Sequence, residues 1–413
     1  MFALACGDIP MPDRTRVIPK CIFCCDLLDG QTKPEHVLHN AFGGRKTTTR
    51  VICSGCNNTF GGGIDRTLTE QFEVIRNLLQ LQSGSGSTAP MLRKIQAGSQ
   101  TVNAHGDGTF ELITKPFTVT KRGDGTFDLQ IAAQSLDDID RLIPHIAASI
   151  GIPELDLRRQ LVRAPAKQVE QRVGPVPFHL EFGGEEALRS AAKSCLVLWA
   201  LTVGNEEVRG DGYKAARTFV THGDENFRQS QAQLDSRPLD EVERVKQSYG
   251  PVFNLIYVRS NEYGRVIGHF TFYNLIAFQL VLADSGGTPN KKIGLISNPL
   301  HSKTWSDKAA EFLDIPFEWL NKPVYQPDLA KERFSNVMQT YVDIYTPKEW
   351  HRLMKETFDE HGIGENDPIP PTLLNGIVSK VSDRIARHML NMPSEETITA
   401  EELQKALGGT LSK

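Results

Sequence analysis

The pattern of apolar and polar residues predicts a chain that contains both helices and antiparallel strands. A helix is expected over residues 66–79, because apolar side chains recur there at helical spacing, with Asp65 as its N-cap. Those apolar positions are Leu68, Phe72, Ile75 and Leu79. A longer helix is expected over residues 185–203, where an apolar body that includes Cys195 precedes Gly204, so this helix should be buried.

Alternating apolar and polar residues predict β-structure in the middle of the chain. Three strands, separated by turns, are expected to form an antiparallel sheet that packs on the helix over residues 185–203. They cover residues 252–259, 265–273 and 275–283. Upstream, Asp-Gly turns within residues 105–113 and 122–131 lead into further alternating residues. We interpret both as plain β-hairpins, because the additional carboxylates of a calcium loop are missing.

From about Thr304 the pattern becomes helical to the end of the sequence. Two Thr-x-x-Glu capping signals, at residues 346–349 and 399–402, predict helix starts there. The proline-rich residues 366–371 separate two helices, either as a stiff corner or as a segment that binds a partner.

These elements predict an α+β protein with three folded parts. Residues 83–90 are small and polar, which predicts a flexible linker after an N-terminal domain over residues 1–82. An antiparallel-sheet-plus-helix domain of unknown role is expected over residues 91–290, and a mainly helical C-terminal region over residues 291–413.

The composition indicates a globular protein of a reducing compartment. The chain has 413 residues, 39% of them hydrophobic, and a net charge of −4, so any nucleic-acid footprint must be local. No apolar run is long enough for a membrane helix, and we expect no membrane partner. Seven cysteines, an odd number, and an N-terminus unlike a signal peptide predict a cytoplasmic protein without disulfides.

Two Cys-x-x-Cys pairs supply the ligand count of a closed tetrahedral zinc site. The pairs are Cys21 with Cys24 and Cys53 with Cys56. Cys25 is a possible competing ligand, but the two-residue spacing favours Cys24. Because 28 residues separate the two pairs, the zinc would join the ends of a sizeable insert. Without further motifs, a zinc ribbon that only binds nucleic acid or protein would be the favoured interpretation.

Further motifs lie inside and just after this insert. They are Glu35-His36, Gly43-Gly44-Arg45, Cys56-Asn57 and Ile64-Asp65. Together with the cysteines, over roughly residues 18–82, they resemble an HNH endonuclease of the zinc-stapled type. The resemblance implies a ββα-metal fold that hydrolyses phosphodiester bonds with a divalent ion and leaves 5′-phosphate and 3′-hydroxyl ends.

The resemblance implies a role for three polar residues. His36 would be the general base, since the pKa of imidazole suits proton transfer near neutral pH. Glu35 and Asn57 would hold Mg²⁺ or Mn²⁺, which stabilises charge on the phosphate and on the leaving oxygen. Adjacent side chains of a strand point to opposite faces, so Glu35 and His36 can share a site only where the strand twists or ends.

The sequence departs from the common family pattern at three positions. Many members have Pro where His39 stands, so His39 is a second ligand, a phosphate contact or, as we favour, a residue without ligand role. Asn57 replaces His, which keeps an oxygen ligand. Thr49-Arg50 stands where many relatives have an Asn that assists the base.

The glycine turn before the second strand of the motif is followed by cations and hydroxyl groups. Arg45, Lys46 and Arg50 are expected to contact phosphate, because cations and Thr hydroxyls can both bind a nucleic-acid backbone. A solvated hairpin loop is the alternative interpretation.

We therefore predict a metal-dependent endonuclease that acts on nucleic acid, most readily DNA, in a setting that resembles antiviral defence or restriction. The remaining residues would select targets, form a homo-oligomer, or restrain cleavage until a ligand or a partner protein binds the C-terminal regions. A zinc-dependent nucleic-acid-binding module without cleavage activity is the alternative.

Overall fold

A computed structural model describes most of the chain and divides it into two compact units. The described residues are 18–28, 32–133, 136–170, 176–178, 180–364, 367–390, 392 and 394–408. The first unit comprises the described parts of Met1–Pro90 and Leu180–Val342, and the second those of Met91–His179 and Asp343–Lys413. Cys6, one of the seven cysteines, and Asn366, the first of the proline-rich residues 366–371, lie outside the described residues.

The N-terminal part of the first unit contains two short strands followed by helices. Strands β1 (Glu35–His36) and β2 (Thr47–Thr48) pair antiparallel, and His36 lies opposite Thr47. The helical elements are η1 (Asn40–Phe42), α1 (Ser54–Gly62), α2 (Ile64–Gln71) and α3 (Glu73–Leu78). The predicted N-cap role of Asp65 is wrong, because Gly63 precedes α2 and Asp65 lies inside its first turn.

A six-stranded antiparallel sheet forms the centre of the first unit. Its order is β14-β13-β10-β11-β12-β9. The bounds are β9 Ala232–Asp235, β10 Asn254–Ser260, β11 Val266–Phe272, β12 Ile276–Ala283, β13 Lys292–Ser297 and β14 Trp305–Ser306. The three strands predicted from the alternation, and their antiparallel pairing, are confirmed by β10, β11 and β12.

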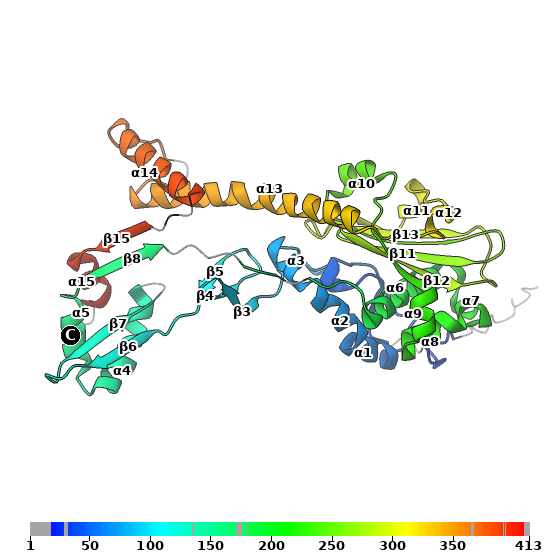
Figure 1. Cartoon of the computed structure of the whole chain (residues 1–413), viewed down its shortest axis with the longest axis horizontal. Helices are drawn as coiled ribbons and strands as arrows, with labels where there is room; N and C mark the ends of the chain where they lie inside the picture. The colour runs from blue at the N-terminus through cyan, green and yellow to red at the C-terminus, as the bar shows by residue number, and fades with distance from the viewer. Residues whose placement is uncertain are drawn as a thin grey trace, which may run out of the picture. The chain divides into compact units, whose positions relative to one another are not determined.

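Helices cover both faces of this sheet (Figure 1). On one face lie α6 (Glu185–Val203), α8 (Lys214–His222) and α9 (Glu225–Gln231). On the other lie α10 (Val242–Tyr249), α11 (Ala309–Phe312) and α12 (Phe317–Leu320). The α7 helix (Asn205–Arg209) and η2 (Asp211–Tyr213) connect α6 to α8. Alternate strand residues enter the two cores, as Ile256 and Tyr257 show.

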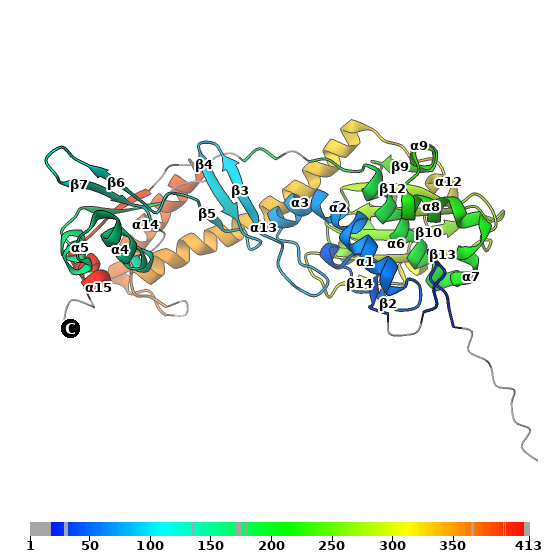
Figure 2. The same cartoon turned by 90° about the horizontal axis from the view of Figure 1, so that it is seen from below.

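The predicted buried helix is α6, and it joins the sheet to the N-terminal helices. Cys195 is fully buried and packs against Gly268 of β11, whose missing side chain leaves room for the thiol. Residues of α1, α2 and α6 belong to one continuous hydrophobic core. Figure 2 shows α1 and α2 beside α6. The N-terminal motif and the sheet thus share their interior.

The second unit contains small sheets and helices. Its elements upstream of the first unit's sheet are β3 (Leu92–Ala97), β4 (Gln100–Ala104), β5 (Phe110–Leu112), β6 (Phe117–Lys121), β7 (Phe127–Ile131), α4 (Leu136–Ile150), α5 (Glu154–Leu161) and β8 (Ala166–Glu170). Both predicted hairpins are confirmed, as β4–β5 and β6–β7. The carboxylates of Asp107 and Asp124 accept hydrogen bonds from Thr109 and Thr126 within the turns.

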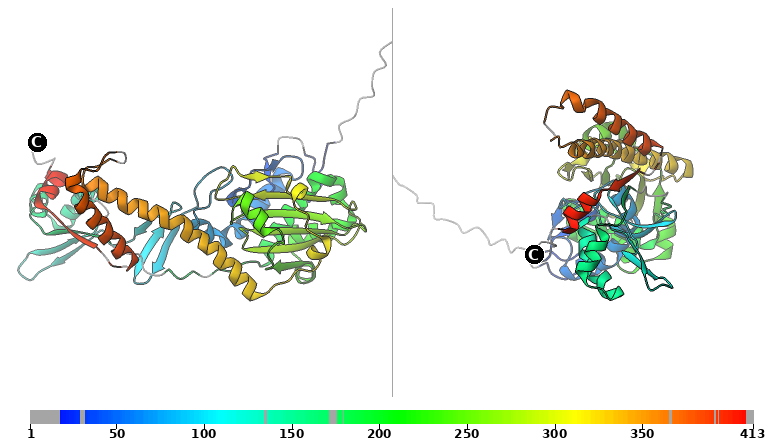
Figure 3. Two further views of the ribbon diagram at one scale, coloured as in Figure 1. Left: turned by 90° about the horizontal axis from the view of Figure 1, so that it is seen from above. Right: turned by 90° about the vertical axis from the view of Figure 1, so that its left-hand side faces the viewer.

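The C-terminal elements are mostly helical, as expected, with one further strand. They are α13 (Pro327–Glu360), α14 (Pro371–Met389), β15 (Ser394–Ile398) and α15 (Ala400–Gly408), and β15 pairs with β8. The predicted helix start at residues 399–402 agrees with α15. The start predicted at residues 346–349 is wrong, because α13 continues through Pro347 (Figure 3).

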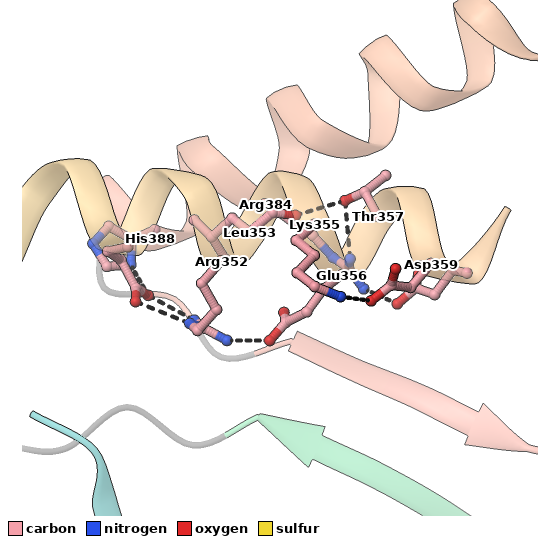
Figure 4. Close-up of polar contacts among 10 residues, drawn as sticks. Arg352, Leu353, Lys355, Glu356, Thr357, Asp359, Arg384 and His388 are labelled. Atoms are coloured by element: carbon pink, nitrogen blue, oxygen red, sulfur yellow. Dashed lines mark hydrogen bonds and ion pairs between the residues drawn. The ribbon is translucent and has the colours of Figure 1, made fainter. Parts of the chain in front are cut away.

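Ion pairs and a buried leucine follow Pro347 in α13 (Figure 4). A proline inside a helix removes one backbone hydrogen bond. Arg352 bonds to both Glu349 and Glu356 at 2.6 Å, and Arg384 of α14 donates to the hydroxyl of Thr357 at 2.9 Å. Leu353, between these residues, is buried. In the described part of the chain, no helix is both long and apolar enough to span a membrane.

Candidate functional site

The two cysteine pairs come together at the start of α1. The Sγ atoms of Cys21, Cys24, Cys53 and Cys56 all lie within 4.8 Å of one another. Cys53 is the N-cap of α1, and its Sγ accepts a hydrogen bond from the backbone N–H of Cys56 at 3.4 Å. Four sulfur atoms around a tetrahedral zinc, each about 2.3 Å from the ion, span a comparable distance. The donor set therefore fits structural zinc.

The four clustered thiols differ in how readily they ionise. A hydrogen bond from the Cys56 thiol lowers the pKa of Cys21 to about 5, while the same contact raises the pKa of Cys56. Burial raises the pKa of Cys24 to about 12. The thiolate is thus favoured at Cys21, while hydrogen bonding at Cys56 and burial at Cys24 favour the protonated thiol. Cys25 is exposed and is not part of this group of ligands.

His36 and Asn57 are each partly exposed. His36 ends β1 and is half-buried, and this desolvation lowers its pKa although the charge of Glu35 opposes the shift. Asn57, also half-buried, lies in α1, where its Nδ2 donates to the backbone oxygen of Lys33 at 3.2 Å. This bond connects α1 to the segment that leads into β1. Among the described residues, no donor is bonded to the Oδ1 of Asn57.

Glu35 points into the protein, away from the half-exposed His36. It is only 4% exposed, and its Oε1 accepts a hydrogen bond from Nζ of Lys193 at 2.6 Å. The structure therefore does not bring Glu35 and His36 to one face of β1, as expected for adjacent residues of a strand. A metal-ligand role of Glu35 stays a prediction.

Lys193 and Ser190 of α6 complete a buried polar cluster with the motif. Nζ of Lys193 also bonds to Oδ2 of Asp65 at 2.5 Å. Ser190 donates to Oδ1 of Asp65 at 2.6 Å and lies 3.1 Å from Nε2 of His39. Nε2 of His39 is itself 3.3 Å from Oδ1 of Asp65. We call these four residues, together with Glu35, the buried acid–lysine cluster.

The opposite charges in this cluster stabilise each other's ionised forms. Burial would raise the pKa of Asp65, but the ammonium of Lys193 and the ring of His39 hold it well below its usual range. Burial would likewise lower the pKa of Lys193, yet Asp65 and Glu35 raise it. The lysine therefore stays charged although its side chain is 1% exposed.

Sequence reasoning missed Lys193 and Ser190. Neither belongs to a motif, and the only available signal is a lysine within a helix that was expected to be buried. Asp65 was noticed, but a helix cap was the default role for an acid just before an apolar helix.

The basic loop of the motif borders a hollow beside β1. Pro34, residues 46–50 and Leu201 line this hollow, whose volume is about 340 Å³. Arg45 and Arg50 are exposed, whereas Lys46 is half-buried and pairs with Asp307 at 2.6 Å. Two exposed cations thus remain available to a ligand with negative charge.

The matched family agrees with this geometry. Residues 21–73 match the family model of the HNH endonuclease, which confirms the resemblance given by the motifs. The chain therefore carries an HNH endonuclease domain, which contains the zinc-type cysteine group and extends into α3. A search of curated proteins and a search of solved structures found no match to this chain.

Proposed function

We propose that this protein is an endonuclease that hydrolyses phosphodiester bonds of nucleic acid, in the first place DNA, with His36 as general base. The observation that carries the proposal is the position of His36. It lies at the end of a strand inside an HNH endonuclease domain, half-exposed, directly opposite Thr47 of the basic loop.

The lowered pKa of His36 suits a base. Desolvation favours the neutral imidazole, which can take a proton from water near neutral pH. Arg45 and Arg50 would orient the phosphate beside the hollow, because guanidinium groups bind phosphate oxygens in pairs of hydrogen bonds. His36 would therefore take the proton from water, while Arg45 and Arg50 bind the phosphate.

A divalent ion fits the donor chemistry of the site. Asn57 offers a carbonyl oxygen, whereas Glu35 could reach the same ion with Oε2 only by turning from the interior, where its Oε1 is bonded to Lys193. When bound, Mg²⁺ or Mn²⁺ would neutralise charge on the phosphate and on the leaving oxygen. Within the described residues, the four cysteines are the one convergent group of His, Cys, Asp and Glu ligands, so phosphate and water would complete the coordination.

The test is plasmid cleavage by the full chain with its zinc bound. Wild type should convert supercoiled plasmid to nicked or linear DNA in Mg²⁺ or Mn²⁺, and His36→Ala should not. The matched control is His222→Ala, an exposed histidine at the end of α8, which should cleave like wild type. Zinc content and melting temperature must agree among the three proteins.

The alternative is a binding module without cleavage activity. It is tested by adding an RNA substrate and a measurement of nucleic-acid binding to this assay. A wild type that binds DNA and RNA but cuts neither with any of the metals would support that alternative. Cleavage of RNA alone would keep the chemistry and change the substrate. The role in antiviral defence or restriction rests on the resemblance alone and needs tests in cells.

A further inference from the structure

We propose that Lys193 of α6 is a positioning residue for His36, because it anchors Glu35 on the inner side of β1 and thereby directs His36 outward. The inference rests on the proposed function of His36. It assigns a role to a residue far outside the HNH endonuclease motif. It also makes α6, the helix that packs on the sheet, part of the nuclease.

The contacts of Lys193 fix three segments of the motif at once. Its ammonium bonds to Glu35 of β1 and to Asp65 of α2, and Asp65 in turn pairs with His39 of the turn before η1. The side chains of Lys193, Glu35 and Asp65 are 1%, 6% and 15% exposed. Ser190 and Lys193 lie one helical turn apart, so one face of α6 binds all three segments.

The strand itself is too short to set the direction of His36. β1 has two residues and pairs only with the two residues of β2. The bond between Glu35 and Lys193 sets the direction of the His36 side chain, since successive side chains of a strand point to opposite faces. While Glu35 is bonded to Lys193, His36 must face the accessible side.

Loss of the ammonium would remove the charged partner of Glu35 and one partner of Asp65, which keeps its contacts with His39 and Ser190. Little water can replace the lost ammonium, because Glu35 is 4% exposed and the side chain of Asp65 is 15% exposed. Either the two carboxylates take up protons or β1 and α2 move apart. In both cases His36 loses its fixed place relative to the phosphate.

Independent contacts show that the motif is built onto the sheet. Nδ2 of Asn254 in β10 donates to the backbone oxygen of Phe42 at 2.7 Å, deep in the interior. Asn205 donates to the backbone oxygens of Lys20 and Arg50 at 2.8 and 2.7 Å. The motif therefore depends on residues 180–342 for its geometry, and Lys193 adds a charged contact to Glu35, the neighbour of the base in β1.

The test compares the full-length, zinc-loaded Lys193→Met with wild type in the plasmid assay. Methionine keeps the length and the burial of the side chain but removes the charge. We expect kcat to fall about 100-fold, the cost of a misplaced catalytic group, with little change in KM. Lys214→Met, an exposed lysine at the start of α8, is the control and should cleave like wild type.

A second variant decides the matter if Lys193→Met does not fold. Asp65→Asn/Lys193→Met removes a carboxylate together with the ammonium, keeps a side-chain oxygen that Ser190 can bond, and leaves the candidate metal ligand Glu35 in place. It too should bind zinc and melt near wild type, yet lose kcat and keep KM. Cleavage at the wild-type rate by either folded variant overturns the inference.

The failure of this inference is distinct from that of the proposed function. If wild type cuts and His36→Ala does not, the proposed function stands, and the Lys193 variants alone decide the positioning role. If wild type does not cut, the proposed function falls and the inference falls with it.

Discussion

The ammonium of Lys193 lies 2.6 Å from the carboxylate of Glu35, although the two residues are 158 positions apart in the sequence. This contact joins β1 of the HNH endonuclease domain to α6, the helix that packs on the sheet. The domain therefore has no separate interior, and substitutions in the sheet should affect the nuclease motif. Five predictions follow from this and from other features of the first unit.

Zinc should depend on the four clustered cysteines and not on Cys25. Cys53→Ser removes a zinc ligand but keeps a side chain that can cap α1, so we expect loss of bound zinc and, with it, a lower melting temperature. Cys25→Ser, an exposed neighbour of the cluster, should keep about one zinc per chain. Atomic emission spectroscopy of the purified proteins gives the zinc content per chain. Equal zinc in both variants would contradict the assignment of Cys53 as a zinc ligand.

Asn254 should stabilise the contact between the motif and the sheet. Its side chain donates to the backbone oxygen of Phe42 and accepts from the backbone N–H of Tyr273 at 3.0 Å, all without exposure to water. Asn254→Ala leaves buried groups unpaired and should cost about 1–3 kcal/mol. The urea midpoint measures this loss, and Asn226→Ala, an exposed position of α9, should leave the midpoint unchanged.

Gly44 should tolerate no side chain, in contrast to Gly61. A Cβ at Gly44 would lie 1.8 Å from the backbone oxygen of Leu38, whereas one at Gly61 of α1 would meet nothing within 4 Å. Gly44→Ala should displace the turn that carries His39 and lower both melting temperature and cleavage. Gly61→Ala should be neutral or stabilise α1 by up to about 1 kcal/mol. Identical behaviour of the two variants would show that the turn adapts.

His269 should make stability fall as the pH drops below 6.5. It is fully buried, bonds to the hydroxyl of Thr271 at 2.7 Å, and faces Asp235, Arg237 and Arg333. Burial lowers its pKa from 6.5 to about 4, so below pH 6.5 the unfolded chain binds the proton first. The contribution of neutral His269 to the free energy of unfolding is complete above pH 6.5 and is lost as the pH falls toward 4.

Comparison with His269→Gln isolates this effect from other titrating groups. Each pH unit between the two pKa values is worth about 1.4 kcal/mol, so wild type should lose about 2 kcal/mol more than the variant between pH 7 and pH 5. Urea unfolding at both pH values measures the difference. Parallel losses in the two proteins would show that His269 does not stay neutral.

Arg45 and Arg50 should contribute to nucleic-acid affinity through charge. Each contact to a duplex phosphate contributes about 0.9 to the slope of log affinity against log salt, so each alanine variant should reduce the slope by that amount. Fluorescence anisotropy with a DNA duplex, in the absence of Mg²⁺, measures the slope without cleavage. Arg228→Ala, which removes a cation from α9, is the control and should keep the wild-type slope. A slope that none of the variants alters would remove the basic loop from the binding surface.

The sequence by itself determined the parts of this protein that depend on local spacing. Four cysteines in two pairs predicted the zinc site, and Glu35-His36 with Cys56-Asn57 predicted the HNH endonuclease domain that the family match confirms. Strand alternation and Asp-Gly turns predicted β10 to β12 and two hairpins. Each of these signals arises from neighbours in the chain, where periodicity and ligand spacing are visible.

Only the tertiary structure decided how these parts combine. It placed Asp65 in an ion pair instead of a helix cap, turned Glu35 away from His36, and brought Lys193 between the two acids. It also carried α13 through Pro347, with ion pairs of Arg352 in the following turns. The reason is physical: a buried charge chooses its partner by proximity in the folded interior, and no spacing along the chain records a contact between positions 35 and 193.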